Sequence, residues 1–370
     1  MYNVFLLKKK YIFEWRIQLS EQKIKILYLG QQNFGWTDTT QHSKAANDLG
    51  AEFLQYNGNS EGELIEHLKD VDAVINQGHD FEDKLFSYMG NNGRCKGLIS
   101  MGHGFEGLNI PEAVKHGVIL ANTASFGTEE VSNHAMMLFL VCSRKFLKHN
   151  NLVKNGTWTR DELSPMGHIS GQTMGIVGIG DIGRAVGRKA KAFGMNIIAY
   201  DPYISSWDAK EYGIETIPDL SELASKSDYV SIHCYQNDET YHMINADFFS
   251  NMKKTAYLIN CSRGGVIDEK ALIKALNNKE IAGAGLDVFE QEPVDPNNPL
   301  LQMENVAVTN HYASYSEQAW IRASTQLGEE AMRVALGYWP MSLINPEVAN
   351  KIATRKKPLN WDMILKKHLG

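Results

Sequence analysis

The sequence predicts an α/β protein made of two domains, each built on a parallel sheet. The chain has 370 residues, which is enough for two domains with separate hydrophobic cores. Short apolar segments alternate with helical segments along it, a rhythm typical of parallel strands joined by helices. A glycine-rich turn within residues 173–193 joins one such strand to one such helix, and the rest of the prediction is arranged around it.

Composition narrows the class of protein. Hydrophobic residues make up 43% of the chain and charged residues 22%, as in soluble globular proteins. The net charge of −6 gives no electrostatic reason to expect nucleic acid or an acidic membrane as a partner. The longest apolar region, 131–147, is interrupted by polar and charged side chains, so no membrane span is predicted. No metal-ligand spacing relates the four cysteines, so we expect no metal site and free thiols in the cytoplasm: Cys95, Cys142, Cys234 and Cys261.

The first part of the chain is expected to form one α/β unit after an N-terminal extension at residues 1–22. Three lysines interrupt the apolar run of this extension, which argues against a signal peptide. Beyond it, the pattern predicts four strands, at 23–29, 72–75, 97–100 and 117–121, with helices around Ala45 and at 61–69.

A long helix is predicted from Thr128, which would be its N-cap, to Leu147. Its apolar residues include Met136, Met137 and Phe139 as well as those of the face turned to the core. A helix that is apolar beyond one stripe needs a second surface on which to bury these side chains. This helix therefore indicates a contact between subunits.

The glycine-rich turn reads G-x-G-x-x-G, and each glycine has a physical task. Gly178 allows the tight turn, Gly180 lets a pyrophosphate approach the backbone, and Gly183 lets the helix pack closely on the strand. The N–H groups at the start of the helix, at Asp181 and Ile182, would hold the phosphate charge.

The segment after this helix predicts which dinucleotide is bound. The apolar run 196–200 ends in Asp201, 18 positions past the last glycine, where a carboxylate can accept hydrogen bonds from a ribose. That carboxylate would repel a 2′-phosphate, and Pro202 and Tyr203 bring no cation. The sequence therefore predicts NAD rather than NADP.

The rest of the chain repeats the βα rhythm and then returns to the first unit. Strands are predicted at 229–232, 256–259, 283–286 and 306–308, and a helix follows from 316 to about 337. The expected domains are a discontinuous one at 23–123 and 316–345, and an inserted one at 124–315. Residues 346–370 are rich in lysine and are expected to form a basic, solvated tail that could pack on a neighbouring subunit.

Three further motifs follow the glycine turn in a fixed order. They read NCSRGGVIDE at 260–269, GLDVFEQEP at 285–293 and VTNH at 308–311. With the glycine turn, these motifs resemble the D-isomer-specific 2-hydroxyacid dehydrogenases over roughly residues 23–345. Segments 128–135 and 233–237 look most like the C-terminal-binding-protein branch, which includes both dehydrogenases and NAD-sensing corepressors. A branch like phosphoglycerate dehydrogenase is also similar.

This resemblance implies two Rossmann-like domains, with a flavodoxin-like substrate domain, an inserted doubly wound NAD-binding domain and an active site in the cleft. It also implies NAD as the cofactor, a 2-oxo or 2-hydroxy acid as the substrate, and a homodimer. The chemistry supports the assignment, because Arg263 can bind a carboxylate by two parallel hydrogen bonds. His311 can give and take a proton near neutral pH, and Glu292 behind it would fix its tautomer.

The resemblance assigns further residues to the cofactor and the substrate. The backbone N–H groups of Gly102, His103 and Gly104 would bind the substrate carboxylate. Asp287 would hold the nicotinamide carboxamide. The other expected cofactor contacts are Thr128, His233, Cys234, Asn237, Cys261 and Ser262. His134 lies on an apolar helix face, so we interpret it as a core histidine with a hydrogen-bond partner rather than a catalytic residue.

The substrate is expected to be small and without a phosphate, such as glyoxylate or hydroxypyruvate. The two segments expected to face it, 76–79 and 100–104, contain neither arginine nor lysine. A phosphate dianion there would lose its hydration without compensation. Two alternatives remain: an NAD(H)-sensing scaffold similar to a corepressor, and a phosphoglycerate dehydrogenase. A formate-type enzyme is disfavoured, because that branch has glutamine where this chain has Glu292.

Overall fold

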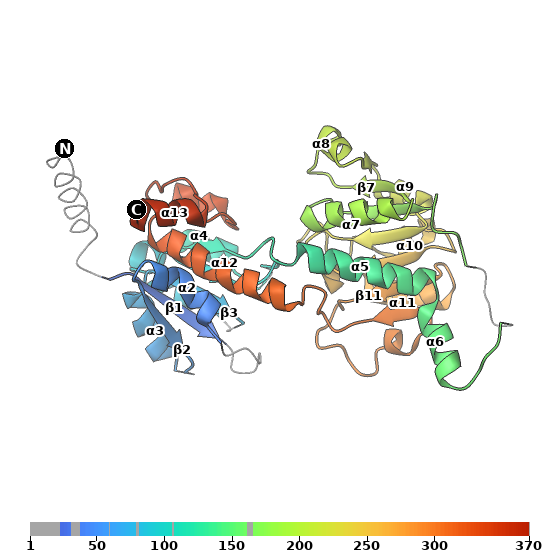
Figure 1. Ribbon diagram of the computed structural model, residues 1–370, viewed down its shortest axis with the longest axis horizontal. Coiled ribbons are helices and arrows are strands. Elements are labelled where there is room, and N and C mark those ends of the chain that lie inside the picture. Colours follow the sequence, from blue (N-terminus) through green and yellow to red (C-terminus); the bar gives the residue numbers. More distant parts are fainter. Residues whose placement is uncertain are drawn as a thin grey trace, which may run out of the picture. The chain divides into compact units, whose positions relative to one another are not determined.

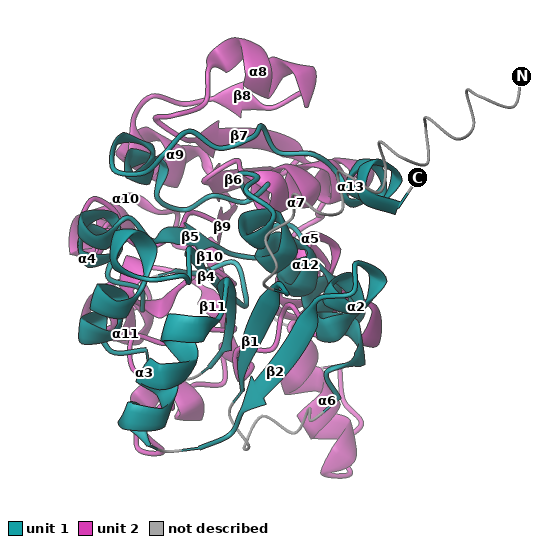
Figure 2. Ribbon diagram, turned by 90° about the vertical axis from the view of Figure 1, so that its left-hand side faces the viewer, with its two compact units in different colours: residues 1–126, 320–370 teal, residues 127–319 magenta. Residues whose placement is uncertain are grey.

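A computed structural model describes residues 23–30, 38–58, 60–78, 81–105, 107–160 and 166–369. The chain forms two compact units (Figures 1 and 2). Unit 1 is Met1–Phe126 with Trp320–Gly370, and unit 2 is Gly127–Ala319. The second unit is thus inserted into the first. The expected N-terminal extension at residues 1–22 lies outside the described residues.

Unit 1 contains a five-stranded sheet in the order β2-β1-β3-β4-β5, with every neighbouring pair parallel. The strands are β1 (Lys25–Gly30), β2 (Glu52–Tyr56), β3 (Ala73–Gln77), β4 (Gly97–Ser100) and β5 (Ile119–Ala121). This strand order is that of a flavodoxin-like sheet, as expected. β2 was not predicted, because this edge strand has no continuous buried apolar run and most of its residues are only half-buried.

Helices cover both faces of this sheet. On one face, α2 (Thr40–Asp48) and α12 (Glu317–Ala335) pack through alanine, leucine and methionine side chains. On the other face lie α3 (Glu61–Asp70), the 3-10 helix η2 (Asp83–Tyr88) and α4 (Ile110–His116); a further 3-10 turn is η3 (Gly90–Asn92). α2 and α12 approach closely at Gly328, where an added Cβ would lie 2.3 Å from the His42 carbonyl oxygen.

The end of the chain packs on unit 1, so the prediction of a solvated tail was wrong. It forms the 3-10 helix η6 (Pro346–Asn350) and the helix α13 (Trp361–Leu369). Val348 and Ile364 are fully buried. The abundance of lysine predicted solvation, but apolar side chains of the segment, among them Ile352 and Trp361, pack against the core of unit 1. The Arg355 guanidinium also donates to the Tyr338 carbonyl, at 3.1 Å.

Asn345 ties this C-terminal segment to the edge of the sheet. Its side chain is fully buried, accepts from the Leu120 N–H at 2.9 Å and donates to the Val118 carbonyl at 2.9 Å. The amide therefore extends the backbone pairing of β5 at this edge, where Ala121 and Leu343 form an antiparallel bridge and the Ile344 N–H donates to the Leu120 carbonyl at 2.9 Å.

Asn345→Ala should lower the free energy of unfolding by about 2–4 kcal/mol, because two buried backbone groups lose their partners. Urea unfolding measures this change. Asn350→Ala, at an exposed residue in the same segment, is the control and should leave the urea midpoint unchanged. Equal stability of the two variants would contradict the role of Asn345.

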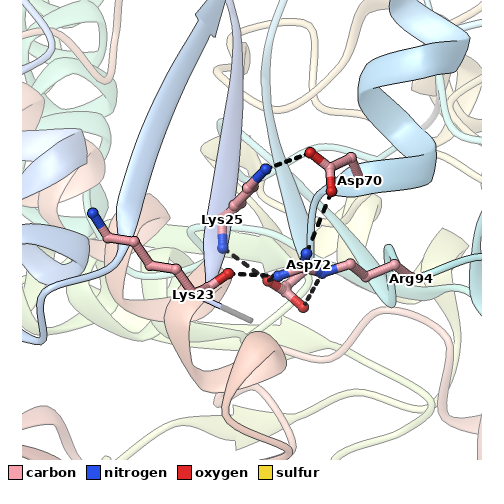
Figure 3. A network of polar contacts seen from close by, with 5 residues as sticks. All are labelled: Lys23, Lys25, Asp70, Asp72 and Arg94. Atoms are coloured by element: carbon pink, nitrogen blue, oxygen red, sulfur yellow. Dashed lines mark hydrogen bonds and ion pairs between the residues drawn. The ribbon is translucent and has the colours of Figure 1, made fainter. Parts of the chain in front are cut away.

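A polar network lies at the amino-terminal ends of strands β1 and β3 in unit 1 (Figure 3). The Asp72 carboxylate accepts from the Lys25 N–H at 2.8 Å and from the Arg94 guanidinium at 2.9 and 2.7 Å. Arg94 also donates to the Lys23 carbonyl at 2.6 Å, and Asp70 pairs with both Lys25 and Arg94. The network joins the amino-terminal ends of β1 and β3, away from the carboxyl ends where parallel sheets bind ligands.

Unit 2 contains a seven-stranded parallel sheet in the order β12-β11-β10-β9-β6-β7-β8. The strands are β6 (Thr173–Val177), β7 (Asn196–Tyr200), β8 (Glu215–Thr216), β9 (Tyr229–Ile232), β10 (Tyr257–Asn260), β11 (Gly283–Leu286) and β12 (Val306–Val308). The order reverses at β6, as in a doubly wound dinucleotide-binding sheet, which confirms the predicted fold class.

Two layers of helices cover the unit-2 sheet. On one face lie α5 (Thr128–Ser143), α7 (Asp181–Ala192) and α8 (Ser206–Glu211), and on the other α9 (Leu220–Lys226), α10 (Ala246–Asn251) and α11 (Glu269–Asn277). Short 3-10 turns are η4 (Gly264–Val266) and η5 (Pro299–Gln302). Among the helices of the described residues, none is both long and apolar enough to cross a membrane.

The single helix predicted to end at Leu147 is in fact two. α5 ends at Ser143, and α6 (Phe146–Lys154) begins after Lys145, whose φ of 51° turns the chain into the left-handed region. Thr128 is the first helical residue, and Gly127 rather than Thr128 occupies the N-cap position. Charged residues at this break fit a helix surface equally well, so the sequence pattern did not reveal it.

Candidate active site

The glycine turn between β6 and α7 has the geometry that the sequence predicts. Gly178 has a φ of 87°, and a Cβ there would lie 2.6 Å from the Cys234 nitrogen. A Cβ at Gly183 would lie 2.1 Å from the Gly178 carbonyl oxygen, so the helix packs on the strand only with glycine. At Gly180 a Cβ would meet no described atom within 4 Å. Open space therefore lies beside the first N–H groups of α7, where a phosphate can approach.

Asp201, at the end of β7, connects this turn to the next strand. Its carboxylate accepts from the Ile179 N–H at 2.9 Å and from the Tyr203 N–H at 3.0 Å. Each oxygen keeps a lone pair, so a ribose hydroxyl can still donate to it. The two backbone donors hold the carboxylate in place beside the glycine turn.

The loop after β9 lies against the same turn. The His233 N–H donates to the Val177 carbonyl at 2.8 Å, and its ring Nε2 is 2.7 Å from the Ser231 hydroxyl. Burial lowers the pKa of His233 to about 3, so the ring is neutral. Burial raises the pKa of the Cys234 thiol to about 12. The Asn237 amide oxygen accepts from the Glu239 and Thr240 N–H groups, so it shapes this loop.

A buried asparagine shapes the turn that carries Arg263. The Asn260 amide oxygen accepts from both the N–H and the hydroxyl of Ser262 at 2.9 Å, and its amide donates to the Arg263 carbonyl at 2.9 Å. Gly264, directly after Arg263, has no room for a side chain, since a Cβ there would lie 1.8 Å from the Phe289 carbonyl oxygen. Arg263 itself is half-buried and extended, and Cys261 before it is buried.

His311 and Glu292 form a close pair. The His311 Nδ1 is 2.6 Å from Glu292 Oε2, while the other Glu292 oxygen accepts from the Phe289 N–H at 3.0 Å. Burial acts to raise the pKa of Glu292, but the hydrogen bonds from His311 and Phe289 and the charge of Arg263 outweigh it and lower the pKa. The carboxylate therefore stays charged near neutral pH. Because it contacts the ring at Nδ1, it leaves the His311 Nε2 available to a substrate.

Asp287 is the residue around which the His311 loop is organised. Its side chain is 1% exposed and accepts from the Thr309 hydroxyl at 2.6 Å and from the Tyr312 and Ala313 N–H groups, each at 3.1 Å. Its backbone carbonyl accepts from the His311 N–H at 2.8 Å. Asp287 thus fixes the histidine loop, a role that the sequence did not predict.

In unit 1, the loop 102–104 is held by the segment that follows β5. Gly102 has a φ of 105°, and its N–H donates to the Thr123 hydroxyl at 3.0 Å. The His103 carbonyl accepts from the Asn122 amide at 3.0 Å, and the His103 ring stacks on Phe126. The prediction that the Gly102 N–H binds a substrate carboxylate needs correction, because this N–H is used to hold the loop.

Comparison with known proteins places this geometry in a family. Residues 136–313 match the model of the D-isomer-specific 2-hydroxyacid dehydrogenase NAD-binding domain. The glyoxylate reductase of Korarchaeum cryptofilum is 38% identical over 289 residues, which cover 77% of this chain and 86% of that protein. The chain belongs to the D-isomer-specific 2-hydroxyacid dehydrogenases. The predictions of the family, of a dehydrogenase and of NAD as the cofactor are thereby confirmed.

Other members of the family show its range. The D-3-phosphoglycerate dehydrogenase of Methanocaldococcus jannaschii is 34% identical over 315 residues, covering 85% of this chain but 59% of that protein. Among solved structures, an acyclic imino acid reductase (Bsp5) in complex with NADPH and D-Arg has a TM-score of 0.75 and 26% identity. That comparison covers 87% of this chain and all of that one.

Two residues with a structural role in this dehydrogenase site were not predicted. Asn260 shapes the arginine turn, and Thr309 holds the Asp287 carboxylate. His134 was predicted to be a core histidine with a hydrogen-bond partner and does have one, since its Nε2 is 2.9 Å from the Thr309 hydroxyl, but its link to the site was not predicted. Asn260 and Thr309 stand in the same motifs as Arg263 and His311, and that position is a sequence signal for their role. The sequence of α5 gives no such signal for His134.

Proposed function

We propose that this dehydrogenase interconverts a small, unphosphorylated 2-oxo acid and the corresponding D-2-hydroxy acid, with glyoxylate and hydroxypyruvate as representative substrates. The observation that supports this most directly is the contact between His311 and Glu292 on the unit that carries the glycine turn. It provides a histidine that can act as a proton donor, together with a carboxylate that stabilises its charged ring.

The proposed mechanism assigns one task to each residue. The guanidinium of Arg263 binds the substrate carboxylate and orients the carbonyl at C2. When it is bound, NADH supplies a hydride to C2. As the carbonyl electron pair moves to its oxygen, the His311 Nε2 donates a proton there, and Glu292 stabilises the imidazolium until that moment. In the reverse direction, neutral His311 removes the hydroxyl proton.

The residues of unit 2 fit NAD. The open space at Gly180 and the N–H groups at Asp181 and Ile182 suit the pyrophosphate, and Asp201 suits the ribose. For the nicotinamide half, we propose Asp287, Cys261 and Ser262 together with the loop at His233, Cys234 and Asn237. Thr128, at the start of α5, is proposed to contact the cofactor as well.

A panel of 2-oxo acids with NADH tests the proposal. We expect measurable turnover of glyoxylate and hydroxypyruvate, and a kcat/KM for hydroxypyruvate at least about tenfold above that for its 3-phosphate, since no arginine or lysine stands in segments 76–79 or 100–104. His79 lies outside the described residues. A preference for the phosphorylated acid would favour a phosphoglycerate dehydrogenase. Poor turnover of every acid would favour the NAD(H)-sensing scaffold.

The coenzyme preference is a separate prediction. Asp201 should make NADH the better coenzyme by about two orders of magnitude in kcat/KM, because its charge opposes the 2′-phosphate of NADPH at close range. Steady-state rates with the two coenzymes measure this. Asp201→Ser should narrow the difference, and a wild-type preference for NADPH would refute the role of Asp201.

We propose a homodimer, and α6 supports it. The α5 side chains expected to support it mostly do not, because Met136 and Phe139 are buried within this chain and Met137 is 38% exposed. No side chain of α6 is buried in this chain, and Phe146 and Val153 are 54% and 53% exposed. Trp158, shortly after it, is 88% exposed. Three large apolar side chains on one projecting segment are typical of an interface. A cytoplasmic location is also proposed, since four free thiols suit a reducing compartment.

Light scattering at micromolar concentration should give twice the chain mass of 41.5 kDa. Replacing Phe146 and Trp158 by serine should shift the protein toward the monomer, because the interface loses most of its apolar area. Tyr241→Ser is the control, since Tyr241 is an aromatic residue outside this segment and its exposed fraction is close to that of Phe146. A monomeric wild type would contradict the proposal.

A further inference from the structure

We propose that His134 is a positioning residue of the acid–base site, which acts through Thr309 and Asp287 on the loop that presents His311. The inference rests on the role proposed above for His311. His134 lies on α5, 175 positions before Thr309 in the sequence, and does not belong to the catalytic motifs.

One residue, Asp287, holds the histidine loop at 309–313. The Asp287 carboxylate receives three donors from residues 309–313, and its carbonyl receives the His311 N–H. All four contacts are made to one buried residue. The position of the loop therefore depends on the orientation of the Asp287 side chain.

The hydrogen bonds at the Thr309 hydroxyl can run in only one direction. A hydroxyl has one proton, and that of Thr309 is donated to Asp287 Oδ1 at 2.6 Å. The Thr309 oxygen must therefore accept from His134, whose Nε2 is 2.9 Å away. His134 Nε2 also lies 3.5 Å from Asp287 Oδ1. His134 is thus a donor that fixes the hydroxyl, and the hydroxyl fixes the carboxylate.

The backbone of His311 needs these hydrogen bonds to keep its conformation. His311 has a φ of 54°, in the left-handed region that residues other than glycine rarely adopt. Its side chain is 46% exposed, so packing alone does not hold the ring. The 2.6 Å contact with Glu292 requires the ring to stay in place. The hydrogen bonds at Asp287 maintain the backbone that places it there.

Burial agrees with this role. The His134 side chain is 7% exposed, and burial lowers its pKa, so the ring is neutral near pH 7 and carries its proton on Nε2. Its ring also meets the Tyr312 ring edge to face, with centroids 4.9 Å apart. Tyr312 directly follows His311. A histidine that served packing alone would need only this ring contact, and the two roles can be separated by substitution.

Two matched pairs of variants make the test. Thr309→Val removes the hydroxyl at nearly constant shape, and Thr309→Ser keeps it. His134→Phe keeps an aromatic ring against Tyr312 without a donor, and His134→Gln keeps a donor near the position of Nε2. We expect Thr309→Val and His134→Phe to lower kcat about 10- to 100-fold. Thr309→Ser and His134→Gln should stay within about threefold of the wild type.

NADH should still bind all four variants, and any rise in its dissociation constant should be smaller than the fall in kcat, because the pyrophosphate and ribose contacts lie at the glycine turn and only the proposed nicotinamide contact of Asp287 is affected. If Thr309→Val and His134→Phe keep the wild-type kcat, the proposal is overturned. If His134→Phe is as active as His134→Gln while both exceed Thr309→Val, His134 serves packing only, which also overturns it.

A second measurement does not depend on turnover. In the ¹⁵N-histidine NMR spectrum, with the His311 ring signals assigned through His311→Asn, these signals should shift or broaden in Thr309→Val and His134→Phe. They should match the wild type in Thr309→Ser. Unchanged His311 signals in Thr309→Val refute the positioning role even if the chain reduces no 2-oxo acid. Conversely, changed signals without any turnover would sustain this inference while the proposed function fails.

Discussion

Replacement of His311 by asparagine should lower kcat by about 10²–10⁴-fold, the range for loss of a general acid, while NADH binds normally. Asparagine has a similar size and can still accept a hydrogen bond, but it cannot deliver a proton near neutral pH. The cofactor residues at the glycine turn do not contact this side chain in the described hydrogen bonds. Stopped-flow single-turnover rates and fluorescence titration with NADH measure the two effects separately.

Glu292→Gln is the matched control for this prediction. It should cost less than His311→Asn, because glutamine still accepts from Nδ1 but no longer stabilises the imidazolium. Nearly wild-type turnover in His311→Asn would contradict the assignment of His311 as the acid. Full activity of Glu292→Gln, with His311→Asn inactive, would instead confine the carboxylate to a structural role.

The sign of the Glu292 shift sets the expected pH dependence. Its pKa in the folded state is lowered below the ordinary 4.5. The stabilisation from the charged carboxylate is therefore complete above the ordinary value and is lost as the pH falls through the lowered one. Glu292 keeps its charge throughout the neutral range. Loss of turnover through protonation of Glu292 should thus begin only below pH 4.5 in the wild type, and Glu292→Gln should lack this acidic limb of the pH–rate profile.

Local motifs predicted the parts of the site that are close together in sequence. Gly178, Gly180 and Gly183 serve a turn whose tight contacts all lie within the unit that carries it. The pairing of Glu292 with His311 was expected from the resemblance and is observed at 2.6 Å. Asp201 was expected beside the glycine turn and contacts it through the Ile179 N–H. In these cases strand and turn geometry alone bring the residues together.

Features that depend on packing between distant segments could not be predicted. The role of His134 requires that α5 pack against β11 and β12, which periodicity does not encode. Asn345 and Ile364 bury a segment whose lysines suggested solvation. The resemblance assigned the Asp287 side chain to a ligand, whereas most of its observed contacts are with residues 309–313. Sequence identifies such residues but not their partners.

Replacement of Arg263 by alanine should lower kcat/KM for the 2-oxo acid by about 10²–10⁴-fold. Each of two charge-assisted hydrogen bonds to a carboxylate contributes about 1.5–3 kcal/mol, and a factor of ten corresponds to about 1.4 kcal/mol. The loss should appear in KM as well as in kcat, because the same contact binds the substrate and orients its carbonyl. Binding of NADH should change little.

Arg263→Lys separates charge from geometry. Lysine keeps the positive charge but offers no planar pair of donors, so it should recover the substrate affinity in part and the turnover less. The turn itself should survive both substitutions, since Asn260, Gly264 and Gly265 build it through contacts of their own, although Arg263→Ala loses the 2.8 Å hydrogen bond from the guanidinium to the Ser262 carbonyl. Circular dichroism and the NADH dissociation constant serve as controls. A variant in which kcat falls while KM stays constant would show that Arg263 acts on the transition state without anchoring the carboxylate, and the anchor would have to be sought elsewhere.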